Sequence, residues 1–254
     1  MSPIYIFLLV MACIAVVVFI ALFFVKAGYG LFTSKKWGLA ISNKVAWCIM
    51  ESPVFLTMLI LWAFAPTDHK TLATLLCLII FEAHYFQRSF IFPFLMKGNS
   101  RMPLSVMFMG VFFNILNALM QGGWLFYFSP NGMYDADWIY TPQFICGTII
   151  FFVGMYINID SDRRIRALRK PGDTKHYMPT GGMFEYVSSA NYFGELVEWI
   201  GFAILTWSWS GAVFAVWTFA NLAPRANSIN KKYAEMFGEA FTQRHVKRMI
   251  PFIY

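Results

Sequence analysis

Two residues inside long apolar segments carry side chains suited to hydrogen-bonding or acid–base chemistry. Glu51 lies in the apolar run 46–65, and Tyr85 lies in the run 71–96. An ionisable group within a membrane helix costs at least a few kcal/mol (roughly), so it is a functional candidate by default. A phenol, or a carboxyl group that stays protonated, can stabilise an oxygen that becomes negative in a transition state, most strongly where water is excluded. Glu51 and Tyr85 are therefore candidate catalytic residues, and joining two helices is the alternative role for Glu51.

Further polar residues lie in the same half of the chain. The run 71–96 also contains Glu82, His84, Gln87 and Arg88. Arg88 lies near the end of that run, where it either belongs to a site or extends its charge to the membrane surface. Asn114, Asn117 and Gln121 are three and four residues apart and so share one face of a helix. These amides either hydrogen-bond between helices or serve the site, and the sequence leaves both roles open.

A second polar group is predicted where the last three apolar runs end. Its members are Asn158, Asp162, Arg169, Asn191, Glu195 and Arg225, which lie at helix ends or in the connection 160–191. The arginines and lysines there are sufficient to bind phosphate groups. The sequence has neither the GxGxxG nor the GxxxxGK[ST] phosphate-binding motif, so a nucleotide would bind between helices. We therefore expect a charged cofactor to enter from the cytosol and a lipid-like substrate to enter from the bilayer.

The remaining residues of interest argue against other kinds of site. The four histidines, His69, His84, His176 and His245, are scattered and form no helical pair that would hold a metal or haem. The four cysteines form no CxxC motif. The net charge of +7 comes from basic residues between apolar runs, which membrane orientation explains without nucleic acid. No metal and no nucleic-acid partner is predicted.

The composition indicates the elements that must position these residues. Hydrophobic residues make up 59% of the 254 residues and charged residues only 13%, which is too few to cover the surface of a soluble domain. Seven apolar runs are expected to be helices, at residues 4–25, 46–65, 71–96, 104–128, 142–159, 192–207 and 211–223. The predicted fold is an all-α, polytopic membrane protein with a single domain over residues 1–254. The run from Ile4 to Val25 is longer than the apolar core of a signal peptide and is expected to stay as the first helix.

The connections between the predicted helices are alternately rich and poor in basic residues. Lysine and arginine are frequent in segments 26–45, 97–103, 160–191 and in the tail from residue 224, and scarce in 66–70, 129–141 and 208–210. Because basic connections face the cytosol, seven helices would place the N-terminus outside and the C-terminus in the cytosol.

With these residues identified, the sequence resembles the steroid 5α-reductases along nearly its whole length. The matching stretches are Gly28-Tyr29-Gly30, Glu51-Ser52-Pro53, His84-Tyr85-Phe86 with Arg88, Asn158-Ile159-Asp160-Ser161-Asp162, Leu168-Arg169-Lys170-Pro171-Gly172, Gly181-Gly182-Met183-Phe184, Tyr186-Val187-Ser188, Ala190-Asn191, Gly194-Glu195, Glu198-Trp199 and Ile250-Pro251-Phe252-Ile253-Tyr254.

The resemblance implies a seven-helix reductase that uses NADPH to reduce the 4,5 double bond of a 3-oxo-Δ4-steroid. It implies that Glu51 and Tyr85 are the catalytic pair and hydrogen-bond the 3-keto oxygen of the substrate. The cofactor-binding residues that it implies are Asn158, Asp162, Arg169, Asn191, Glu195, Arg225 and Tyr233. Helices 1–4 would then serve mainly the substrate, and helices 5–7, with loop 160–191 and the C-terminal tail, mainly NADPH. We expect a monomer surrounded by membrane lipids, in the bacterial inner membrane or the endoplasmic reticulum depending on the source.

The sequence departs from the family pattern in places and leaves other functions open. Met50 stands where the family often has glutamine, His176-Tyr177-Met178 precedes Pro179, and Asn227-Ser228-Ile229-Asn230 replaces a histidine-rich stretch. One alternative is a related membrane reductase of enoyl thioesters or polyprenols, and another is a methyltransferase that uses S-adenosylmethionine. A seven-helix receptor or transporter is the non-enzymatic alternative. The pairing of Glu51 with Tyr85 favours the steroid reductase.

Overall fold

The chain forms a bundle of long helices in the computed structural model, which describes residues 2–26, 28–32, 34–173 and 175–254. The α-helices are α1 (Pro3–Phe24), α2 (Asn43–Ala63), α3 (Leu72–Phe86), α4 (Phe92–Leu95), α5 (Leu104–Gly123), α6 (Pro142–Ala167), α7 (Ala190–Thr206), α8 (Trp209–Phe237) and α9 (Glu239–Thr242). Two π-helical turns, η4 (Gln87–Ile91) and η5 (Trp124–Phe128), follow α3 and α5. Short 3₁₀ turns are η1 (Gly30–Phe32), η2 (Lys35–Trp37), η3 (Thr67–His69), η6 (Ala136–Tyr140) and η7 (Gly182–Glu185).

Five helical segments of the described chain are long and apolar enough to cross a membrane. They are Pro3–Phe24, Asn43–Ala63, Leu72–Leu95, Leu104–Phe128 and Pro142–Ala167. Large apolar side chains such as Leu9, Val17 and Phe24 on α1 are exposed, as expected for a surface that contacts lipid. The sixth and seventh predicted runs are also helical, but α7 has only 17 residues and the second half of α8 is polar. The protein is thus predominantly helical, and its five apolar helices suggest a multi-pass membrane protein.

Two helices extend beyond their predicted boundaries. The connection predicted at 160–191 begins too early, because α6 continues to Ala167. Asp160 pairs with both Arg163 and Arg164, one turn further along the helix, at 2.7 Å and 2.6 Å, and such pairs stabilise a helix in water. The last predicted helix, at 211–223, also ends too early, because α8 continues to Phe237 with Pro224 inside it.

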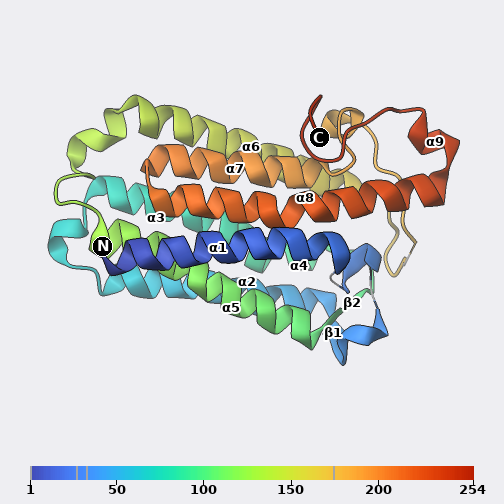
Figure 1. Ribbon diagram of the computed structural model, residues 1–254, viewed down its shortest axis with the longest axis horizontal. Helices are drawn as coiled ribbons and strands as arrows, with labels where there is room; N and C mark the ends of the chain where they lie inside the picture. The colour runs from blue at the N-terminus through green and yellow to red at the C-terminus, as the bar shows by residue number, and fades with distance from the viewer. Residues whose placement is uncertain (1, 27, 33, 174) are drawn as a thin grey trace.

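A small sheet was not predicted. Strands β1 (Ala40–Ser42) and β2 (Arg101–Pro103) pair antiparallel, with Ile41 opposite Met102. Each strand has only three residues, too few to produce an alternating pattern in the sequence. The sheet joins the segment before α2 to the segment before α5 at one end of the bundle (Figure 1).

Glycines bring α6 and α7 into direct backbone contact. A side-chain carbon on Gly154 would collide with the backbone of Glu198, and one on Gly194 would collide with the backbone of Asn158. Small residues allow such an approach between helices that lack a hydrophobic driving force in lipid. In Figure 1, α6, α7 and α8 lie side by side, while α2 and α5 run together on the other side of the bundle beside α1. Aromatic rings of Phe81 and Trp199 connect α3 to α7, 5.6 Å apart.

Candidate active site

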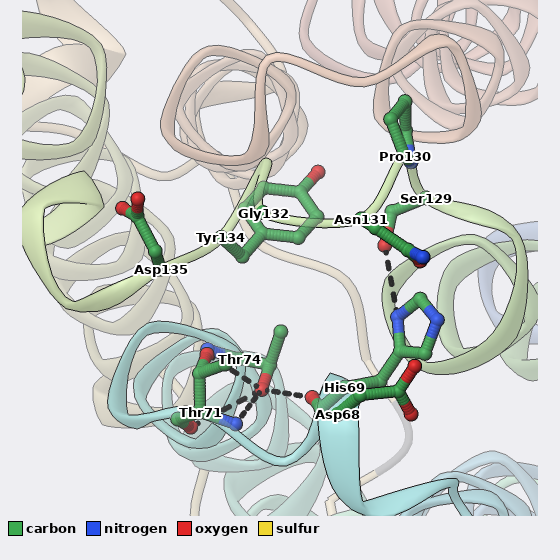
Figure 2. A pocket seen from close by; sticks show the side chains of 10 residues that line it. All are labelled: Asp68, His69, Thr71, Thr74, Ser129, Pro130, Asn131, Gly132, Tyr134 and Asp135. Carbon is green, nitrogen blue, oxygen red and sulfur yellow. Dashed lines mark hydrogen bonds between the residues drawn. The ribbon is translucent and has the colours of Figure 1, made fainter.

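The bundle has a cavity at each end, and one predicted site residue, Arg169, lines the larger of the two. At the end where α3 begins, a cavity of about 200 Å³ is lined by Asp68, His69, Thr71, Thr74, Ser129, Pro130, Asn131, Gly132, Tyr134 and Asp135. Figure 2 shows His69 and Ser129 facing each other there, with His69 Nδ1 3.3 Å from the Ser129 hydroxyl. None of the residues predicted to bind substrate or cofactor lines this cavity.

The larger cavity, of about 670 Å³, lies at the opposite end of the bundle. It is lined by residues of three segments: Gly30, Leu31, Ser34, Gly38, Leu39 and Ala40; Gly98, Asn99, Ser100, Arg101 and Pro103; and Arg169, Asp173 and His176. The guanidinium of Arg169 lies 2.9 Å from His176 Nδ1. Burial and the charge of Arg169 lower the pKa of His176 below its usual value, so the neutral ring can accept this hydrogen bond. Arg169 and Arg101 give this cavity two guanidinium groups.

Within the bundle, one face of α5 contacts both predicted catalytic residues. Asn114 Nδ2 donates to Glu51 Oε2 at 3.1 Å and to the carbonyl oxygen of Met50 at 2.8 Å. One turn further along, Asn117 Nδ2 donates to the Tyr85 hydroxyl at 2.9 Å. Tyr85 is only 3% exposed and Asn117 is fully buried. The face formed by Asn114, Asn117 and Gln121 thus connects α2 to α3, and Glu51 and Tyr85 meet that same face.

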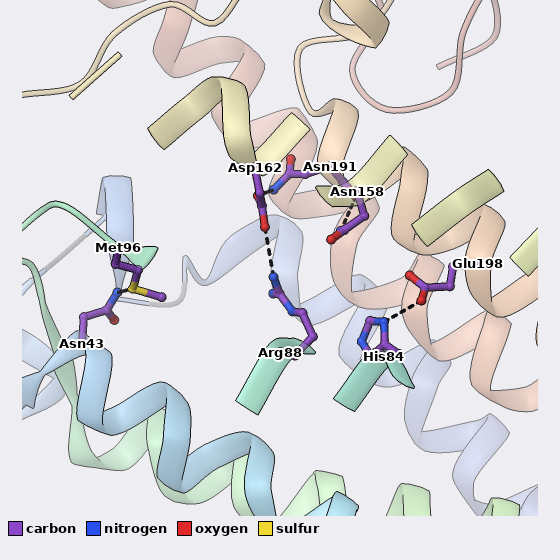
Figure 3. Close-up of polar contacts among 8 residues, drawn as sticks. All are labelled: Asn43, His84, Arg88, Met96, Asn158, Asp162, Asn191 and Glu198. Atoms are coloured by element: carbon purple, nitrogen blue, oxygen red, sulfur yellow. Dashed lines mark hydrogen bonds and ion pairs between the residues drawn. The ribbon is translucent and has the colours of Figure 1, made fainter. Parts of the chain in front are cut away.

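Three predicted cofactor residues are joined by hydrogen bonds. Asn158 Nδ2 donates to the carbonyl oxygen of Asn191 at 2.9 Å, and Asn191 Nδ2 donates to Asp162 Oδ1 at 3.2 Å. The other oxygen of Asp162 forms an ion pair with Arg88 at 3.1 Å (Figure 3). This network connects the end of α6 with the start of α7, and through Arg88 it reaches the element that follows α3.

Arg88 is buried in this polar network rather than extended to the outside of the bundle. Its side chain is only 11% exposed. The guanidinium also lies over the rings of Phe92 and Trp47, 4.4 Å and 4.8 Å from their centroids. A buried arginine at this position is stabilised by its carboxylate partner and by the aromatic faces. The predicted residue Glu195 lies on α7, one helical turn after Asn191.

Arg225 on α8 meets the segment after α1. Its Nε donates to the Tyr192 hydroxyl at 2.9 Å and its Nη2 donates to the carbonyl oxygen of Tyr29 at 3.1 Å. The guanidinium also lies 3.8 Å from the centre of the Tyr29 ring. The remaining predicted residue, Tyr233, packs its ring against Phe237 and Phe241. The structure therefore brings Asn158, Asp162 and Asn191 together, whereas Arg225, Arg169 and Tyr233 occupy separate places around the same end of the bundle.

A buried pair between α3 and α7 was missing from the predicted site. His84 Nδ1 lies 2.8 Å from Glu198 Oε1, and Glu198 is fully buried (Figure 3). Both residues were visible in the sequence as polar residues within apolar runs, but their distance along the chain gave no indication that they meet. Tyr29 and Tyr192, the partners of Arg225, were missed because tyrosine at a helix end is common and carries no specific signal.

The polar end of the bundle fits a nucleotide that carries phosphate groups. Three glycines, Gly30, Gly38 and Gly98, line the 670 Å³ cavity and leave it free of their own side chains. In the last turn of α6, Nη1 of Arg166 is buried without a hydrogen-bond partner among the described residues. A buried guanidinium donor without a partner is costly and is suited to an anionic oxygen. No group of three or more His, Cys, Asp or Glu side chains in the described segments could hold a metal ion.

Comparison with known proteins shows the family to which the chain belongs. A family model described as 3-oxo-5-alpha-steroid 4-dehydrogenase matches residues 100–254. A steroid 5-alpha-reductase DET2 from Gossypium hirsutum is 37% identical over 251 residues, which cover 97% of this chain and 96% of that relative. A 3-oxo-5-alpha-steroid 4-dehydrogenase 1 from Bos taurus is 38% identical and covers 94% of this chain and 93% of its own length. The human protein of the same name is 37% identical, with coverages of 89% and 86%. The chain belongs to the steroid 5-alpha-reductase family and is an oxidoreductase of the 3-oxo-5-alpha-steroid 4-dehydrogenase class.

Proposed function

We propose that this chain uses NADPH to reduce the 4,5 double bond of 3-oxo-Δ4-steroids such as testosterone or progesterone. The observation that carries the proposal is the shared face of α5, where Asn114 and Asn117 hydrogen-bond Glu51 and Tyr85. Two acidic hydrogen-bonding groups on one side of a buried helix suit a single carbonyl oxygen better than they suit a polyprenol, which has no carbonyl. The family membership supports the same reaction.

In this proposal, Glu51 and Tyr85 bind the 3-keto oxygen of the substrate. When bound, NADPH supplies the hydride that adds to the β-carbon of the enone. That addition places negative charge on the keto oxygen, and two fixed donors in a water-poor site stabilise the enolate-like transition state. Glu51 takes part as a donor in its protonated form, while the Tyr85 hydroxyl donates directly. A proton derived from solvent then completes the product at the α-carbon.

We propose that the polar end of the bundle binds the cofactor. Asn158, Asp162, Asn191 and Glu195 would hold its nicotinamide half, since they lie nearest α3 and its Tyr85. Arg169, Arg225 and Tyr233 would bind the phosphates and the adenosine. The glycine-lined cavity and the unpaired Arg166 donor support this assignment. Helices α1–α5 then form mainly the substrate half, and α6–α8 with the loop between α6 and α7 and the tail form mainly the NADPH half.

We further propose that α7 and α8 are the sixth and seventh membrane spans, with the N-terminus outside and the C-terminus in the cytosol. The alternation of basic and non-basic connections supports this orientation. The protein would act as a monomer among membrane lipids, in a bacterial inner membrane or in the endoplasmic reticulum according to its source.

The reaction can be tested with purified protein in detergent or in lipid nanodiscs. Progesterone or testosterone is incubated with NADPH or NADH, and the steroid products are separated and identified. The expected product is the 5α-reduced 3-oxosteroid. Intact steroid, together with turnover of an enoyl thioester or a polyprenol by the same preparation, would contradict the steroid assignment.

Arg169 tests the identity of the cofactor. Arg169→Ala should raise the KM for NADPH more than the KM for NADH, because an arginine in this cavity can pair with the additional 2′-phosphate. Arg163→Ala is the matched control, since Arg163 is 66% exposed and pairs with Asp160 on the outside of α6. Equal changes in both KM values for Arg169→Ala would show that Arg169 does not recognise the 2′-phosphate.

A further inference from the structure

A chain of side-chain amides runs from the first turn of α8 to the Tyr85 hydroxyl. Gln121 Nε2 donates to the carbonyl oxygen of Ser210 at 3.0 Å and lies 3.5 Å from Asn117 Oδ1. Asn117 Nδ2 then donates to Tyr85 at 2.9 Å. Asn117, Gln121 and Ser210 are all fully buried. No water competes for these bonds, so each amide has a fixed set of partners.

The carbonyl of Ser210 determines which group donates and which group accepts in each hydrogen bond of this series. A backbone carbonyl oxygen can only accept, so Gln121 must turn its nitrogen toward Ser210. The same nitrogen then faces Asn117, whose oxygen must point to it, and this leaves the Asn117 nitrogen facing Tyr85. Because an amide nitrogen only donates, the tyrosine oxygen is the acceptor in that bond. The hydroxyl hydrogen of Tyr85 is therefore free to be donated to another group.

Asn114 donates a hydrogen bond to Glu51 in the same way that Asn117 donates one to Tyr85. The carbonyl oxygen of Met50 accepts from Asn114 Nδ2, which fixes that nitrogen between Met50 and Glu51. Asn114 thus donates to Oε2 of Glu51 and leaves Oε1 as the oxygen that can carry a proton. Each of these two asparagines on one face of α5 therefore donates a hydrogen bond to one residue of the proposed catalytic pair. Each leaves that residue able to donate its own proton.

We propose that Asn117 is a positioning residue that directs the Tyr85 hydrogen toward the keto oxygen of the substrate. This inference rests on the proposed function, in which Tyr85 donates to that oxygen. Asn117 does not touch the substrate in this account. It occupies the acceptor position of the phenol, so that the phenol meets the substrate as a donor. An asparagine that only joined α5 to α3 would have no such effect on the chemistry.

The test is a double-mutant cycle in kcat, measured with NADPH and a 3-oxo-Δ4-steroid. Asn117→Leu keeps the approximate size of the side chain and removes the donor, and it should lower kcat about tenfold, the rate equivalent of one ordinary hydrogen bond. In a Tyr85→Phe background the same substitution should change kcat by less than about twofold, because its effect passes through the phenol. The KM for NADPH should stay unchanged.

A binding measurement separates positioning from a merely structural role. The wild-type protein should bind a 5α-reduced 3-oxosteroid more tightly than the matching 3-deoxy steroid, and both Asn117→Leu and Tyr85→Phe should reduce this preference. A structural defect would weaken both ligands equally. Asn43→Leu is the matched control, since Asn43 is also buried but contacts Met96 near the start of α2, outside the site. It should leave the preference intact.

The outcomes distinguish this inference from the function on which it rests. Wild-type turnover in Tyr85→Phe would contradict the catalytic pair itself. Impaired Tyr85→Phe, together with wild-type turnover in Asn117→Leu or with fully multiplicative losses in the double mutant, would overturn only the role of Asn117. If Asn117→Leu does not fold, Gln121→Met removes the group that orients Asn117 and should lower kcat in the same direction. Wild-type kcat in folded Gln121→Met would also overturn the inference.

Discussion

At the scale of single residues, two buried glutamates of the bundle differ in their partners. Glu198 has one oxygen 2.8 Å from His84, whereas neither oxygen of Glu82 has a hydrogen-bond partner among the described residues. A buried polar group without a partner keeps its full cost of desolvation. Glu82 is therefore a destabilising residue in the folded protein, and the proposed reaction does not use it.

Replacing Glu82 should make the protein more stable. Glu82→Leu is expected to raise the free energy of unfolding by about 1–3 kcal/mol, since it removes an unpaired polar group from a buried position. Glu198→Leu is the control expected to lower stability, because it leaves His84 without its hydrogen-bond partner and should cost about 1–3 kcal/mol. Thermal unfolding in a single detergent measures both. A lower unfolding temperature for Glu82→Leu would show that this carboxyl group has a partner or a function.

The sequence indicated which residues could form a site better than it indicated their contacts. Asn158, Asp162 and Asn191 were predicted together because they lie at neighbouring helix ends, and hydrogen bonds join them in the structure. The contact of Arg88 with Asp162 spans 74 positions and depends on how η4, which follows α3, lies against the end of α6. No local pattern encodes such a contact, and the same is true of Asn117 with Tyr85. The roles of these residues in catalysis and cofactor binding remain predictions.

At the scale of elements, the closest helix packing is between α6 and α7. Four glycines lie at this contact, and a side-chain carbon on any of Gly147, Gly154, Gly194 or Gly201 would collide with the backbone of the opposite helix. The contact holds Asn158 and Asp162 on α6 against Asn191 on α7. Helix α7 also carries Glu198 and Trp199 toward α3, so the spacing between α6 and α7 affects both halves of the site.

Adding one methyl group at this contact should destabilise the protein. Gly154→Ala is expected to cost about 1–3 kcal/mol, because rigid backbone rather than a flexible side chain must move. Gly123→Ala in α5 is the matched control, since its added carbon would meet only Ile4 and Phe128 side chains at ordinary contact distance. That control should be neutral or more stable by up to about 1 kcal/mol through helix propensity. Equal unfolding temperatures for the two variants would contradict the close packing of α6 and α7.

Element type was predicted more accurately than element boundaries. Long apolar runs can only be helices in lipid, because every backbone group must find its partner within the segment. The two apolar runs that end at residues 159 and 223 stop before their helices do, because α6 and α8 continue as polar helices. The sequence predicts a connection and a tail there, since the apolar runs end at residues 159 and 223. The three-residue strands β1 and β2 depend entirely on each other and could not be predicted.

At the scale of the whole molecule, the proposed orientation places the two cavities on opposite sides of the membrane. Loop 129–141, which lines the small cavity with Asp135, lies at the end where α3 begins. The loop between α6 and α7, which contains Arg169 and His176, lies at the opposite end with the larger cavity. A charged cofactor is available in the cytosol, so the larger cavity is expected to face that side.

Reporter fusions test this orientation. A reporter placed after residue 133 should face outside, and one placed after residue 175 should face the cytosol, because the intervening α6 crosses the membrane once. Pairs of fusions in phosphatase and fluorescent-protein forms give opposite signals on the two sides and control for expression. The same location for both fusions would contradict the seven-helix topology and the separation of the two ends.

The account depends most directly on the chemistry of Glu51 and Tyr85, and single-turnover kinetics with a 3-oxo-Δ4-steroid measure it. Glu51→Gln and Tyr85→Phe are each expected to lower the rate of steroid reduction by about 100- to 1,000-fold, the usual effect of losing one oxyanion donor in a dry site. NADPH affinity should be retained, and the double variant should be little slower than the slower single variant, because both groups act on one oxygen. A folded, NADPH-binding Glu51→Gln protein that reduces the steroid at the wild-type rate would show that Glu51 only joins α2 to α5, and would contradict the proposed mechanism.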